Sequence, residues 1–134
     1  MRIRIRIGKM EVFAALKKTP TAEKIWGALP FGSRAETWGQ EVYFSVPVNV
    51  ALEADAREVV DSGTVCFWTQ GNCLAIAFGP TPISKGAECR LADRCNIFGK
   101  LEGDPRTLRD VRSGEDVRVE RAAGNEKLDE RETP

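Results

Sequence analysis

The feature that most constrains the fold is a pair of apolar stretches separated by a turn. Residues 64–69 and 73–78 read TVCFWT and CLAIAF, and the three residues between them, QGN, are typical of a tight chain reversal. Both stretches carry apolar side chains at odd and even positions alike, so each strand would need cover on both faces. The pattern therefore predicts a β-hairpin at the centre of a sheet.

A third strand is predicted at the N-terminus, where arginine and isoleucine alternate over residues 2–7. This period of two places three isoleucines on one face and three arginines on the other. The arginine face is either the solvated side of a half-buried strand or a ladder that binds anions. The first interpretation is favoured, because the chain carries 20 basic and 20 acidic residues and has a formal net charge of zero.

One segment has the spacing of a helix. Thr19 is a typical N-cap residue, and Pro20 suits the first helical position. Proline at position 30 would end the helix, because it cannot continue the hydrogen-bond ladder. The apolar stripe of this helix is formed by Ala22, Ile25, Trp26 and Leu29.

The remaining pattern predicts a mainly β fold. Further strands are expected at residues 12–16, 41–46, 56–61, 95–101 and 115–121, with a glycine-containing loop at 31–40 and one helical turn at 107–111. Strands of this number and length favour a closed or nearly closed antiparallel β-barrel of eight strands, with the short helix capping an end. An open sandwich is the alternative. The barrel domain is expected at residues 1–123, followed by a flexible C-terminal tail at 124–134.

Composition limits the partners and the compartment. A neutral chain of 134 residues fits one domain and has no general attraction for nucleic acid. No apolar run reaches the length of a membrane helix, and no apolar block follows the N-terminal arginines as in an export signal. We therefore expect a cytoplasmic protein that binds neither nucleic acid nor a membrane.

The chemistry open to this chain is restricted by the absence of histidine. Serine–histidine and cysteine–histidine nucleophile systems are excluded, so catalysis would rest on carboxylates, lysine, tyrosine, cysteine or electrostatic stabilisation. The four cysteines form no Cys-x-x-Cys pair, which favours scattered reduced thiols over a zinc site. Cys66 and Cys73 lie in apolar stretches and are expected to pack as small hydrophobic residues. Neither a metal nor a cofactor is predicted.

Several strings, in their order along the chain, resemble a family of small prokaryotic cyclophilin-like proteins. The resemblance covers about residues 1–121 and implies the eight-stranded antiparallel barrel of the cyclophilins, with a short helix over one end. Cyclophilins isomerise peptidyl-prolyl bonds with an arginine beside an apolar pocket, but their hallmark Phe-x-x-x-x-Phe-Met-x-Gln-Gly-Gly strand is absent here. The matching strings are TPTA at 19–22, LP at 29–30, WGQEVYF at 38–44, Gly63, FGPTP at 78–82, NIFGK at 96–100 and the segment 111–119.

The candidate site lies on the loop and strand at 34–43, with residues 78–90 as the opposing wall. Side chains alternate along this strand, so Val42 and Phe44 would fill the barrel while Glu41 and Tyr43 line a groove outside it. Aromatic walls with a few polar groups suit an organic ligand. The alternative is that these charges are simply solvated and that the tryptophan covers a barrel end. The predicted ligand-binding residues are Arg34, Trp38, Glu41, Tyr43, Phe78, Thr81, Glu88 and Arg90.

Three classes of function stay open at this point. The favoured one is a binding module that holds a small molecule or an extended peptide in a groove of the barrel. The second is a peptidyl-prolyl isomerase with a non-standard active site, in which Arg34 or Arg90 would supply the arginine. The third is an accessory subunit of an amide-hydrolysing assembly, because related barrels occur in such assemblies. A protein partner or a homo-oligomer stays open beside the small-molecule or peptide ligand.

Overall fold

The alternating N-terminal segment forms a strand at the middle of a large antiparallel sheet. In the computed structural model, which describes residues 1–123, strand β1 (Arg2–Ile7) pairs with β2 (Met10–Leu16) on one side and β10 (Asp116–Ala122) on the other. Its three isoleucines are almost completely buried in the main core. Strand β1 therefore contributes one full face to the interior, as its period of two predicts.

The arginines of β1 are neutralised by carboxylates on the neighbouring strands. Arg4 lies opposite Glu120 and forms an ion pair of 3.1 Å with it, and Arg6 lies opposite Glu11 at 3.3 Å. Such half-exposed pairs add little stability, but they balance the charges on the outer face of the strand. This arrangement supports the interpretation of the arginine face as the solvated side of a half-buried strand.

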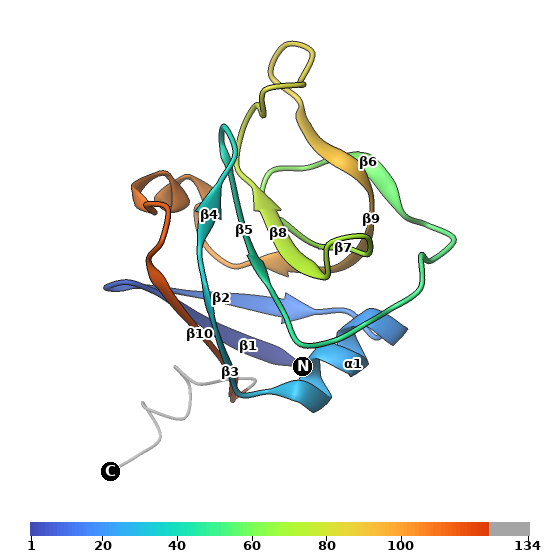
Figure 1. Ribbon diagram of the computed structural model, residues 1–134, viewed down its shortest axis with the longest axis vertical. Helices are drawn as coiled ribbons and strands as arrows, with labels where there is room; N and C mark the ends of the chain where they lie inside the picture. Colours follow the sequence, from blue (N-terminus) through green and yellow to red (C-terminus); the bar gives the residue numbers. More distant parts are fainter. Residues whose placement is uncertain (124–134) are drawn as a thin grey trace.

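The sheet curls until its two ends nearly meet, which produces the barrel seen in Figure 1. The seam is bridged where Ser33 Oγ, on one end strand, donates a hydrogen bond of 2.7 Å to the carbonyl oxygen of Ser45, on the strand next to the other end. The strand order is β3 (Phe31–Arg34), β10, β1, β2, β9 (Cys89–Leu101), β7 (Thr64–Trp68), β8 (Cys73–Ala77), β5 (Glu41–Ser45) and β4 (Glu36–Thr37), and β6 (Arg57–Val60) pairs with β9.

The predicted nearly closed antiparallel barrel is confirmed, with ten strands in place of eight. The predicted loop at 31–40 contains β3 and β4, because β10 and β5 offer strand edges that satisfy their backbone groups. Strand β9 begins at Cys89 rather than near residue 95, since its first part pairs with β6. A short 3-10 helix at Pro105–Asp110 occupies the position of the predicted helical turn.

The apolar hairpin is central, as predicted. Strand β7 lies between β9 and β8, and β8 lies between β7 and β5. Phe67 belongs to the main core, whereas Cys66, one position earlier, belongs to a second apolar cluster on the opposite face. That second cluster consists of Val60, Cys66, Ala77, Cys89, Leu91, Cys95 and Ile97, with Trp68 packed against it. The first part of β9 and β6 thus cover the outer face of the hairpin.

Helix α1 (Pro20–Ala28) begins and ends where the sequence predicts. Thr19 caps it by accepting a hydrogen bond from the backbone of Ala22, and the helix stops two residues before the proline at position 30. Ala22 and Ile25 are buried in the main core, and Trp26 packs at its margin. No helix within residues 1–123 is long and apolar enough to cross a bilayer. The predicted flexible tail at 124–134 lies outside the described residues.

Candidate functional site

Strand β5 separates the barrel interior from the candidate site by the alternation of its side chains. Val42 and Phe44 are 1% exposed and belong to the main core. Glu41 and Tyr43 point to the opposite face of the sheet and line a pocket outside the barrel. The first part of β9 bends over this face and closes the pocket from the other side.

The pocket has a volume of about 160 Å³ and is mostly apolar. An engineered protein cavity of about 150 Å³ holds one benzene molecule, so the space suits a group of about one ring. Three aromatic side chains contribute to its walls, together with small apolar residues. The lining residues are Trp38, Glu41, Tyr43, Trp68, Cys73, Ala75, Leu91, Ala92 and Cys95.

Glu41 is the polar group that gives this pocket its chemistry. Its side chain is only 6% exposed, and its buried Oε1 atom has no hydrogen-bond partner among the described residues. Burial alone raises the pKa of this carboxyl group from 4.5 to about 7, because the charged form loses its hydration. A buried carboxyl group without a hydrogen-bond partner costs stability, and titratable groups perturbed in this way are common at functional sites.

The thiol groups around Glu41 do not neutralise it. Cys73 and Cys95 line the pocket, and burial raises the pKa of both thiols, that of Cys95 to about 12. Cys66 and Cys89 are also buried, with their pKa raised by loss of hydration. All four cysteines are free, and no group of three residues within positions 1–123 has a geometry that could hold a metal ion. The thiols are therefore neutral at pH 7.

The position of the Trp68 indole ring depends on a glycine in the hairpin turn. A side chain at Gly71 would overlap the ring carbons of Trp68, so the absence of one lets the indole lie across the turn. The indole Nε1 of Trp68 is buried and has no hydrogen-bond partner in the described part of the chain. The pocket thus includes an unused donor in addition to the unused carboxylate oxygen.

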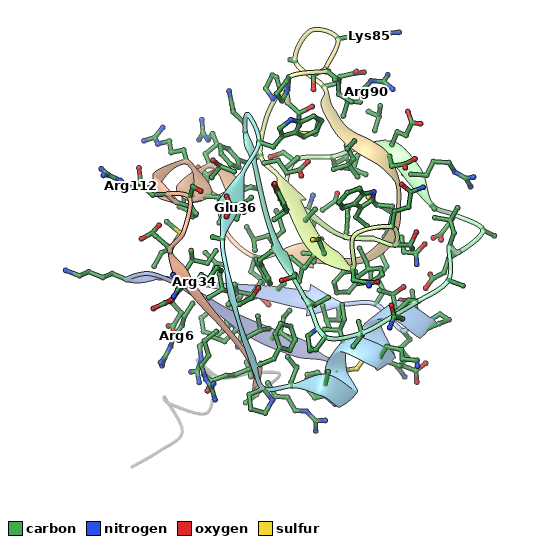
Figure 2. The ribbon with its side chains drawn as sticks, in the orientation of Figure 1. Arg6, Arg34, Glu36, Lys85, Arg90 and Arg112 are labelled. Atoms are coloured by element: carbon green, nitrogen blue, oxygen red, sulfur yellow. The ribbon has the colours of Figure 1, made fainter. Side chains whose placement is uncertain are left out.

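The structure brings together three of the residues predicted from the sequence: Trp38, Glu41 and Tyr43. Arg34 is exposed in the neighbouring groove and lies 3.7 Å from Asp116. Figure 2 shows Arg34 at the left of the molecule beside the orange strand β10, away from Arg90 near the top.

The other predicted residues do not belong to the pocket wall. Arg90 forms ion pairs with Glu88 at 2.6 Å and with Glu58 at 3.1 Å, close to the loop of Lys85 (Figure 2). Thr81 is buried, and its hydroxyl donates to the carbonyl oxygen of Arg90. The side chain of Phe78 packs at the margin of the main core. The segment 78–90 therefore braces the start of β9 instead of lining the pocket.

Sequence reasoning missed six lining residues: Trp68, Cys73, Ala75, Leu91, Ala92 and Cys95. Trp68, Cys73 and Ala75 lie on alternating positions of the apolar hairpin, so its second apolar face was a usable signal. Leu91 belongs to a stretch with no strand signal of its own, and Cys95 is the first residue of the strand predicted at 95–101. Their position depends on pairing with β6, which the sequence does not encode locally.

A wider groove adjoins the pocket at the seam of the barrel. It has a volume of about 560 Å³ and shares Tyr43 and Cys73 with the pocket walls. Its other lining residues come from β3, β4 and β5. A ligand held in the pocket could therefore extend past Tyr43 along the seam.

The fold and its lateral pocket define the class of protein: a small antiparallel barrel of the cyclophilin type, with one short helix. The chain belongs to the cyclophilin-like family, whose model, described as "Cyclophilin-like", matches residues 1–120. The family predicted from the sequence is thus confirmed. A comparison with curated proteins found no match.

Two solved structures share the fold. The solution structure of the hypothetical protein AF2241 from Archaeoglobus fulgidus has a TM-score of 0.78 and 37% identity, and the match covers 91% of this chain and 95% of that one. McbB in complex with tryptophan has a TM-score of 0.64 and 22% identity, and the match covers 90% of this chain but 45% of McbB. The second likeness concerns the fold alone.

Proposed function

We propose that this protein binds a small organic molecule in the lateral pocket, with Glu41 as its polar anchor. The observation that carries the proposal is the buried carboxyl group of Glu41, which has no partner within residues 1–123 and faces an aromatic pocket. Ligand sites are typically apolar with a few placed polar groups, and a bound molecule would supply the missing hydrogen bond.

The size of the pocket favours a small molecule over an extended peptide. A volume of 160 Å³ accepts about one ring, whereas a peptide advances roughly 3.3 Å with each residue and would soon leave the pocket. The peptidyl-prolyl isomerase alternative receives no support from the two candidate arginines. Arg34 lies outside the pocket, and Arg90 is occupied by Glu88 and Glu58. The structure of McbB with tryptophan adds nothing beyond the fold, so the proposal depends on the pocket itself.

The three tryptophans offer a direct test by NMR of the ¹⁵N-labelled protein. Trp38 and Trp68 line the pocket, whereas Trp26 lies on helix α1 beneath Arg121 and serves as an internal control. Phenol, aniline and benzylamine, titrated in turn, are suitable single-ring probes. We expect saturable shifts of the Trp38 and Trp68 indole signals with at least one probe, and no change for Trp26.

A substitution that fills the pocket provides the matched control. Ala75→Leu adds bulk to the pocket wall without touching Glu41, and it should abolish the shifts. Ala87→Leu makes the same change at an exposed position in the loop before β9 and should leave them intact. The proposal fails if no probe shifts the pocket tryptophans, or if binding survives Ala75→Leu in a protein that still shows a folded spectrum.

A further inference from the structure

The charge of the ligand can be inferred from what surrounds Glu41, an inference that rests on the proposed function. Loss of hydration on burial accounts for the raised pKa of Glu41, and no basic side chain among the described residues lowers it. The titratable groups around it are the Tyr43 hydroxyl on β5 and the thiols of β7, β8 and β9. The thiols belong to Cys66, Cys73, Cys89 and Cys95. The pKa of each thiol, and that of the Tyr43 hydroxyl, is raised, so all of these groups are neutral at pH 7.

Within residues 1–123, no basic side chain stacks on an aromatic ring of the pocket. In the described residues, the guanidinium groups that stack on rings are Arg2, 4.3 Å from Phe13, and Arg121, 4.6 Å from Trp26. Neither ring belongs to the pocket. A cation on the face of tryptophan or tyrosine gains about 0.5 to 2 kcal/mol, and more when water is excluded.

In the described part of the chain, the Glu41 carboxylate has no counter-ion and lies beside three aromatic side chains without a stacked cation, an arrangement that is complementary to a positively charged group. We propose that the ligand carries a small organic ammonium group, held between the Glu41 carboxylate and the side chains of Trp38, Tyr43 and Trp68. A protonated or methylated amine fits a space of 160 Å³, and its alkyl groups suit the apolar walls. The rest of the ligand would leave past Tyr43 into the groove at the barrel seam.

A pair of probes with the same shape isolates the contribution of charge. Choline and 3,3-dimethylbutan-1-ol differ in one atom, nitrogen in the first and carbon in the second, and therefore in one positive charge. At pH 8 we expect choline to bind at least ten times more tightly, measured by calorimetry and by the indole signals. Glu41→Gln should reduce this difference at least severalfold, because the amide keeps the shape of the side chain and loses the charge, while the aromatic side chains still favour the cation.

Control variants and a pH series complete the test. Glu23→Gln removes an exposed carboxylate of helix α1 and should leave the preference for choline unchanged. Choline affinity should rise between pH 6 and pH 8, because the cation prefers the ionised form of Glu41 and that form becomes populated in this range. Folding of Glu41→Gln is checked by its amide spectrum, and Trp38→Leu serves as a second variant that should weaken choline more than the neutral alcohol.

The outcomes separate the two proposals. Equal binding of both probes, tighter binding of the alcohol, or choline affinity that falls with pH would overturn the ammonium inference. Binding of neutral single-ring probes without any binding of choline would overturn it too, while leaving the proposed function intact. The absence of binding by every probe, charged or neutral, would refute the proposed function as well.

Discussion

Asn96 on β9 donates a hydrogen bond of 2.9 Å to the hydroxyl oxygen of Thr21 at the start of helix α1, and neither side chain has any solvent exposure. The same amide group donates 2.9 Å to the carbonyl of Ala51 and accepts 2.7 Å from the backbone of Glu53. The Glu53 carboxylate in turn accepts from Thr21. This network joins the helix, the segment before β6 and β9.

Replacing Asn96 should therefore destabilise the barrel. Asn96→Ala leaves several buried groups without partners, at roughly 1–3 kcal/mol for each such group, and we expect a loss of about 3 kcal/mol. The exposed Asn49 gives the matched control, Asn49→Ala, which should change stability by less than about 0.5 kcal/mol. Urea unfolding measures both. Equal stability of the two variants would show that the network contributes nothing.

Glu41 should make the stability of the free protein fall as pH rises from about 4.5 to about 7. Glu41 releases its proton near pH 4.5 in the unfolded chain but near pH 7 in the folded one. The protonated carboxyl group therefore makes its full contribution to the free energy of unfolding below pH 4.5. This contribution is lost between pH 4.5 and about pH 7. The loss from pH 5 to pH 8 amounts to about 2 to 3 kcal/mol.

The corresponding measurement is urea unfolding at pH 5 and pH 8 for the natural sequence and for Glu41→Gln. The glutamine variant should lack this part of the pH dependence and should be the more stable protein at pH 8. A variant as pH-sensitive as the natural chain would contradict the assignment of the shifted group.

A methyl group at Gly71 should disturb the pocket through Trp68. The added carbon of Gly71→Ala would overlap the indole ring, so Trp68 has to move and the ligand probes should bind at least several times more weakly. Gly27→Ala on helix α1 meets no atom within 4 Å and serves as the control. Intrinsic fluorescence should change in the first variant only. Unchanged probe affinity in Gly71→Ala would remove Trp68 from the site.

Thr81 should affect stability and not ligand binding. Thr81→Val keeps the shape of the buried side chain but deletes the donor to the Arg90 carbonyl, which costs about 1 to 3 kcal/mol. Probe affinity should stay within about twofold, because Thr81 is absent from the pocket wall. Affinity that collapses while the melting temperature is retained would restore the original prediction of Thr81 as a ligand-binding residue.

Much of the fold follows from local pattern. The alternation of β1, the two-sided hairpin of β7 and β8, and the capped helix are each determined by side-chain periodicity within one short stretch of the chain. The same alternation along β5 predicts that Glu41 and Tyr43 share a face opposite Val42 and Phe44. These features need no knowledge of the rest of the chain, because each depends on which neighbouring positions are apolar.

What the tertiary structure decided is which faces meet. The bend of β9 over the outer face of the hairpin brings Leu91 and Cys95 to Glu41, and this placement depends on pairing with β6 more than 30 residues earlier. Arg90 shows the opposite case, because a residue beside the pocket wall in sequence is held outside it by Glu58 and Glu88. Burial of a carboxyl group and the pairing of an arginine depend on contacts with residues distant in sequence. The local sequence therefore indicates candidate residues, but it does not tell which of them line the pocket.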